Sequence, residues 1–229
     1  MKLCPPGSHP VQSHQRQTAK GLILVQSHCR KNPSSKGKVL FGSNLKYLYE
    51  ASPPKDIKLE KIKGFGGFHS YDPMIYFWVE YWKRAGLLPP AFDPLIVKSM
   101  IAVESSFRSN VITSLPNSSA AGLMQIVRST LHPLSGKPNR QGYIEIKRHP
   151  IELEYDELLD PIVNVAAGVR WLAHKIMTSP KRRSESQDER IFAGIKYYHS
   201  WDRAGEKYAE RVLKLYRDSR KPPTPKGDL

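Results

Sequence analysis

The sequence has few of the residues that build metal centres or disulfide frameworks. It holds two cysteines, Cys4 and Cys29, and its eight histidines are scattered without a His-x-x-x-His spacing; no Cys-x-x-Cys occurs. Zinc sites need closely spaced ligands of these types, and a disulfide scaffold needs several cysteines in a short chain. We therefore predict no metal, no cofactor and no disulfide framework.

The sequence also lacks long apolar runs. The longest run near the start, residues 22–25, is far short of the roughly 20 apolar residues that a membrane-spanning helix needs. Residues 1–10 contain three prolines and a glycine in place of the roughly 7–15-residue apolar core of a secretory signal. We expect no transmembrane segment and no recognisable signal peptide.

Acidic residues are scarce, with 21 Asp and Glu against 36 Lys and Arg, and the net charge is +15. Such a surplus favours a polyanionic partner, such as nucleic acid, a membrane surface or an acidic cell-wall polymer. The surplus is strong at the start, because residues 1–67 hold twelve basic and three acidic residues among many Pro, Gly and Ser. We predict that residues 1–67 are a basic, largely irregular and flexible N-terminal extension.

Helix signals begin after this extension. An Asp cap followed by Pro at the first helical position marks a helix start, and the chain has this pair at residues 72–73, 93–94 and 160–161. The apolar periodicity predicts helices over 72–85, 94–107, 161–177, 187–198 and 206–217. Strand signals are weak, the best being Gly142–Ile146. We predict a mostly α domain over 68–218 and a disordered tail over 219–229, which is rich in Pro and Lys.

One carboxyl lies in an unusual place. Met100 and Phe107 belong to the apolar stripe of the helix predicted over 94–107, and Glu104 lies on or beside that stripe. Partial burial disfavours the ionised form and raises the pKa of a carboxyl, as a general acid working near neutral pH requires. The alternative is a structural Glu104 that pairs with a Lys or Arg.

Two short motifs carry a family resemblance. Residues 104–107 read Glu-Ser-Ser-Phe, and residues 122–126 read Gly-Leu-Met-Gln-Ile. In this order the pair resembles the soluble lytic transglycosylase family, which is related to goose-type lysozymes. The resemblance covers roughly residues 94–216. It implies a mostly α, lysozyme-like domain with a substrate groove.

The resemblance also implies roles for individual residues. Glu104 would act as the acid and then as the base, Ser105 would hold the substrate near it, and Gln125 with the backbone around Met124 would bind sugar. The chemistry agrees, because an amide such as that of Gln125 offers donors and acceptors to hydroxyl and N-acetyl groups. For Met124, packing in the core is an equal alternative.

The third signature of the family is an Ala-Tyr-Asn segment on a later helix, whose tyrosine points at the acid. Residues 193–199 read Ala-Gly-Ile-Lys-Tyr-Tyr-His, so the tyrosine is Tyr198 or Tyr197. We prefer Tyr198, which leaves His199 in the place of the asparagine. The other tyrosine is then expected to pack in the core.

The implied activity is cleavage of the MurNAc-GlcNAc β-1,4 bond of peptidoglycan with formation of 1,6-anhydroMurNAc. Most glycosidases use two carboxyls, but no second acid here matches a family motif, so a single-acid mechanism is expected. The alternatives are a lysozyme-type muramidase, or a non-catalytic module that binds cell wall or nucleic acid. The expected partners are glycan strands and, through the extension, anionic wall polymers, without specific nucleic acid. The expected place of action is the periplasm, reached through a phage holin or a secretion system.

Overall fold

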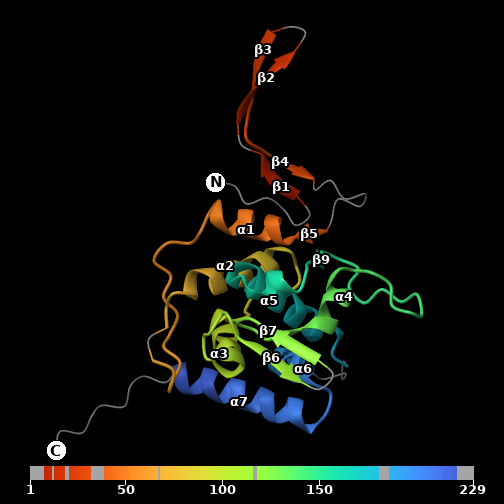
Figure 1. The fold of residues 1–229 in the computed structure, drawn as a ribbon. Coiled ribbons are helices and arrows are strands. Elements are labelled where there is room, and N and C mark those ends of the chain that lie inside the picture. Colours follow the sequence, from red (N-terminus) through yellow and green to blue (C-terminus); the bar gives the residue numbers. More distant parts are fainter. Residues whose placement is uncertain are drawn as a thin grey trace, which may run out of the picture.

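The computed structural model describes residues 8–11, 13–18, 21–31, 39–66, 68–115, 118–180 and 186–220. Within these ranges the chain forms seven α-helices: α1 (Gly42–Glu50), α2 (Asp72–Arg84), α3 (Pro94–Ser105), α4 (Leu131–Leu134), α5 (Pro161–Thr178), α6 (Gln187–His199) and α7 (Arg203–Arg220) (Figure 1). The fold is mostly helical, as predicted, and none of these helices has the length and apolarity of a membrane span. The tail predicted over 219–229 lies outside the described residues from 221 onward, while 219 and 220 end α7.

All three Asp-Pro pairs lie at helix starts as predicted, but only two of the three Asp side chains cap their helices. The Asp93 carboxylate accepts a hydrogen bond from Leu95 N at 2.9 Å, and the Asp160 carboxylate accepts one from Ile162 N at 2.9 Å. Asp72 differs, because Tyr71 takes the cap position of α2 without a side-chain hydrogen bond. The buried Asp72 carboxylate instead forms an ion pair with the buried Lys98 of α3, 2.8 Å away, and thereby ties α2 to α3.

Helix α5 runs through the helical part and packs against α1, α2 and α6 (Figure 1). Its predicted apolar stripe is buried, but so are polar residues elsewhere on its circumference, including Asn164 and Arg170. The indole Nε1 of Trp82 in α2 donates to Ala166 O of α5 at 3.1 Å. Because α5 is covered on nearly all sides, its backbone is a rigid support for the loops that pack against it.

A small antiparallel sheet, which the sequence analysis did not predict, lies beside the helices. It consists of β6 (Ile112–Leu115), β7 (Ser118–Ala121) and β8 (Ile126–Val127), in the order β6-β7-β8. The strand predicted at Gly142–Ile146 is wrong, since that segment has no strand structure. Strand β7 reads Ser-Ser-Ala-Ala and has none of the β-branched or aromatic residues that signal a strand, so its pairing depends on its neighbours.

The boundary predicted at residue 67 also differs from the structure. Strand β5 (Leu40–Phe41) pairs in parallel with β9 (Ile151–Glu152), and Leu45 and Leu48 of α1 are buried in the same core as α5. Ile62 is buried there as well. Before this segment, β1 (Ser8–Val11) pairs with β4 (His28–Lys31) and β2 (His14–Thr18) with β3 (Gly21–Val25), in the hairpin that projects from the helices in Figure 1. Residues 40–66 therefore belong to the folded domain.

Candidate active site

Glu104 lies in the last turn of α3. The helix ends at once after it, because Ser106 and Phe107 both adopt left-handed backbone conformations, with φ of 51° and 64°. Such angles are unusual for residues other than glycine and reverse the chain direction sharply. Phe107 turns back into the core, where it stacks on Phe68 at 5.0 Å and meets the edge of Phe65 at 6.2 Å. The segment before α2 thus fixes the turn that follows Glu104.

The surroundings of Glu104 favour its protonated form. Burial raises the pKa of its carboxyl from 4.5 to about 7, and the Tyr208 hydroxyl acts in the opposite direction. Glu104 keeps partial access to solvent, so its proton can be exchanged. A carboxyl that is half protonated near pH 7 is suited to give a proton to a leaving oxygen and to take one back.

Two tyrosines, the buried Tyr208 and the partly buried Tyr198, interact with this carboxyl from different helices. Tyr208 of α7 interacts with Glu104 only weakly, because its hydroxyl has no partner at full hydrogen-bond distance within the described chain. Burial, and next the charge of Glu104, raise the pKa of Tyr198 of α6 well above its ordinary value. His199 stacks on Tyr208 with ring centroids 4.6 Å apart. The ring of Tyr197, in contrast, contacts Trp201 at 4.2 Å, so the two tyrosine candidates have separate surroundings.

The loop over residues 122–125 is held in place by its backbone. Met124 N donates to Asn164 Oδ1 of α5 at 2.8 Å, and Met124 O accepts a hydrogen bond from the Tyr198 hydroxyl at 2.8 Å. The Met124 side chain is buried against Gly168, where an added Cβ would lie 2.4 Å from the sulfur. Gly122 has φ of 77° and no room for a side chain. The loop is therefore fixed between α5 and α6.

Two side chains that we predicted to bind sugar have hydrogen bonds inside the protein. Gln125 donates to two backbone carbonyls at 2.8 and 3.1 Å and accepts from the Thr113 hydroxyl at 2.7 Å. The Ser105 hydroxyl donates to Ile101 O at 3.2 Å, and the residue is only 2% exposed. Both side chains brace the site in this structure, and their contact with substrate stays a prediction.

The family profile described as "Transglycosylase SLT domain" matches residues 81–191. Residues 81–191 are a transglycosylase SLT domain. Comparisons with curated proteins and with solved structures gave no match. The profile match spans from α2 to α6 and includes Glu104 and the loop over 122–125. An SLT domain supports a lytic transglycosylase-type function on peptidoglycan in general.

Sequence analysis missed the part that Asn164 plays in the SLT domain. Its amide is fully buried, and besides accepting from Met124 N it donates to Ala121 O at 2.9 Å and to Leu158 O at 2.8 Å. A buried amide with all of these partners satisfied fixes three segments relative to one another. The signal in the sequence was an amide between Val163 and Val165 in an apolar helix.

Tyr208 was missed as well. It lies beyond residue 191, where the match to the SLT profile ends, and so does Tyr198. In the sequence Tyr208 is one of several aromatic residues near the chain end, and only the packing of α7 against α3 brings it to Glu104. The surroundings of Glu104 therefore include residues that lie outside the segment matched by the SLT profile.

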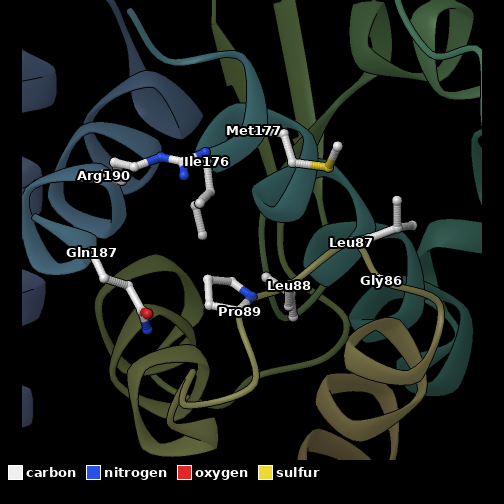
Figure 2. Close-up of a pocket in the computed structure, with 8 residues that line it drawn as sticks. All are labelled: Gly86, Leu87, Leu88, Pro89, Ile176, Met177, Gln187 and Arg190. Carbon is white, nitrogen blue, oxygen red and sulfur yellow. The ribbon is translucent and has the colours of Figure 1, made fainter. Parts of the chain in front are cut away.

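The cavity in Figure 2 lies apart from this chemistry. It has a volume of about 350 Å³ and is lined by Gly86, Leu87, Leu88, Pro89, Ile176, Met177, Gln187 and Arg190. These residues include no carboxylate and neither of the tyrosines beside Glu104. A cavity whose lining includes no acid cannot protonate a glycosidic oxygen, so we place the reaction at Glu104 and not here.

Proposed function

We propose that the protein is a peptidoglycan lytic transglycosylase that cleaves the MurNAc-GlcNAc β-1,4 bond, with Glu104 as its single acid and base. The observation that carries the proposal is the raised pKa of the Glu104 carboxyl. Among the described residues, burial and the Tyr208 hydroxyl account for its pKa of about 7, and no second carboxylate takes part. Two-carboxyl glycosidases instead have a second acid within about 5–10 Å of the first.

In the proposed reaction Glu104 first acts as the acid. Its proton goes to the bridging glycosidic oxygen, the bond from that oxygen to C1 of MurNAc breaks, and the N-acetyl group of the same sugar assists the departure. The 6-hydroxyl oxygen of MurNAc then attacks C1. Its proton goes to the Glu104 carboxylate, so the acid is restored and a 1,6-anhydro ring closes without water.

The neighbouring groups support this cycle. Glu104 is charged only between the two proton transfers, and the weak contact with the Tyr208 hydroxyl favours that charged state. The loop around Met124 is tied to α5 by Asn164 and to α6 by Tyr198. We propose that the backbone of this fixed loop holds the sugar beside the acid, since a preformed site loses little entropy when it binds.

The test compares the wild type with two charge-removing variants. Each purified protein is incubated with peptidoglycan, and the released muropeptides are analysed by mass spectrometry. Glu104→Gln removes the proposed acid, whereas Glu154→Gln removes an exposed acid of the segment before α5. The wild type and Glu154→Gln should release muropeptides with 1,6-anhydro ends, and Glu104→Gln should release none.

Other results would change the assignment. Reducing ends in place of anhydro ends would make the enzyme a lysozyme-type muramidase with the same acid. Release by Glu104→Gln at the wild-type rate would remove Glu104 from the mechanism. No release by a well-folded wild type would favour a module that only binds cell wall or nucleic acid.

The proposal includes a role for the basic start of the chain. Residues 1–38 hold seven Lys and Arg and no acid, and we propose that they hold the enzyme on anionic wall polymers in the periplasm. Because residues 40–66 are part of the core, the informative deletion is 1–38 and not 1–67. It should abolish salt-sensitive binding to intact wall and retain activity on soluble fragments. Unchanged wall binding would contradict this role.

A further inference from the structure

The connection between α6 and α7 presents an exposed tryptophan. Trp201 is 66% exposed, whereas the other three tryptophans of the chain, Trp78, Trp82 and Trp171, are buried. Leaving so large an apolar side chain in water is unfavourable, because burial of its apolar surface would stabilise the protein. An exposed aromatic ring of this size is therefore a candidate contact surface.

The backbone that carries Trp201 is fixed on both sides. Asp202 accepts hydrogen bonds from the Ser200 hydroxyl at 2.6 Å and from Ala204 N at 2.9 Å. Gly205 packs so closely against the end of α6 that an added Cβ would lie 2.2 Å from Ser200 O. The backbone of the turn that carries Trp201 is thus held by hydrogen bonds and by close packing.

The indole itself is supported from behind. The ring of Tyr197 lies 4.2 Å from it at an interplanar angle of 31°. The ammonium of Lys175, in α5, lies 6.0 Å from the Trp201 ring and 3.9 Å from the ring of Trp171. An aromatic ring that packs against a second ring and is otherwise largely exposed offers a flat binding surface at a small entropic cost.

This platform lies near the proposed active site along the chain. Trp201 follows Tyr198 by three residues and precedes Tyr208 by seven, and both tyrosines interact with Glu104. Three residues of chain span at most about 11 Å, so the backbone of Trp201 lies within about 11 Å of that of Tyr198. We take this separation to be within the reach of a strand of several sugar rings bound at Glu104.

The charges around the platform favour an uncharged ring over a phosphate. Two ammonium groups that lie 6.0 Å from these rings are already in ion pairs, Lys175 with Glu145 at 3.1 Å and Lys196 with Glu206 at 3.7 Å. Binding of single-stranded nucleic acid combines stacking with cations that are free to meet the backbone. The exposed apolar area of one ring is also far below the roughly 1,000 Å² of a specific protein interface.

We propose that Trp201, backed by Tyr197, is a stacking subsite for a pyranose ring of the glycan strand whose bond lies at Glu104. The aliphatic C–H face of a sugar ring carries partial positive charge and complements the negative face of the indole. This inference rests on the proposed function, since it names a second contact of the same substrate. It implies that oligosaccharides long enough to span both places bind more tightly than short ones.

The test is a binding measurement that needs no catalysis. The full chain is titrated with the hexamer and the dimer of N-acetylglucosamine, and binding is followed by tryptophan fluorescence and calorimetry. Because the other three tryptophans are buried, a blue shift on binding reports mainly on Trp201. Trp201→Ala should raise the Kd of the hexamer roughly five- to tenfold, and Trp201→Phe should stay within about threefold of the wild type. Met177→Ala, an exposed apolar residue of the cavity in Figure 2, is the matched control.

Several outcomes would overturn the inference. These are an unchanged hexamer Kd in a folded Trp201→Ala variant, no binding of the hexamer by the wild type, or a loss confined to single-stranded DNA in the same titration. Failure of the proposed function is seen separately, because the muropeptide assay then shows no release while the effect of Trp201→Ala on hexamer binding persists.

Discussion

Replacing the proposed acid should make the fold more stable at alkaline pH. In wild type the Glu104 carboxyl must lose its proton in surroundings that disfavour the charge, and its pKa is about 7 in place of 4.5. Glu104→Gln keeps the size and the polarity of the side chain and removes only the titration. The variant should therefore lack a pH-dependent loss of stability that the wild type has.

The sign and size follow from proton linkage. Below pH 4.5 both the folded and the unfolded wild type bind the proton, so the carboxyl contributes no difference. Between 4.5 and about 7 the unfolded chain loses the proton first, and wild-type stability falls with rising pH. A pKa difference from 4.5 to about 7 corresponds to about 3 kcal/mol, an upper limit because Glu104 is partly open to solvent.

The assay is chemical unfolding at 25 °C across a series from about pH 4 to about pH 9. Relative to their difference at the acid end, Glu104→Gln should gain up to about 3 kcal/mol over the wild type by about pH 8. Glu154→Gln, which removes an exposed acid, should follow the wild type throughout. A Glu104→Gln advantage that is the same at every pH would refute the reasoning, since it would mean that burial does not perturb this carboxyl.

Three further predictions concern the supports of the site. Tyr208→Phe removes the hydroxyl that lowers the pKa of Glu104, so the alkaline limb of the kcat/KM profile should move to higher pH; an unmoved limb would contradict the contact. Gly168→Ala places a Cβ 2.4 Å from the Met124 sulfur and should destabilise the fold by about 1–3 kcal/mol in urea unfolding, with a lower kcat; wild-type values would show that the loop is free to move. Asn164→Ala leaves buried backbone groups unpaired and should lower stability by about 3 kcal/mol in the same assay, whereas a loss below about 1 kcal/mol would show that water replaces the amide.

Local chemistry in the sequence predicted most of the helices. Asp93 and Asp160 cap their helices as expected, because a cap needs only the residues that follow it. Asp72 has the same local signal, but Lys98 offers its carboxylate a buried partner from another helix. The sheet was missed for the same reason, since strand β7 is stabilised by its neighbours and not by its own residues.

In the site, too, some features could be predicted from the local sequence and others depend on tertiary contacts. The position of Glu104 beside an apolar stripe was visible in the sequence, and its raised pKa agrees with that position. The sequence around Tyr197 and Tyr198 allowed either tyrosine to be aligned with the family motif. Only their tertiary contacts differ, because Tyr197 contacts Trp201 and the Tyr198 hydroxyl donates to Met124 O. The hydrogen bonds of Gln125 depend on the positive φ of this residue, which the neighbouring sequence did not predict. Whether Gln125 binds substrate stays a prediction.

The distance along the chain between Glu104 and its two tyrosines has a consequence for truncated gene products. A chain that terminates after residue 191 would retain the whole segment that the SLT profile matches, but not Tyr198 or Tyr208. A nascent chain on the ribosome likewise contains Glu104 and the loop over 122–125 before it contains either tyrosine. Reading frames that end early would thus pass a motif search and yet encode Glu104 without the two tyrosines that interact with it.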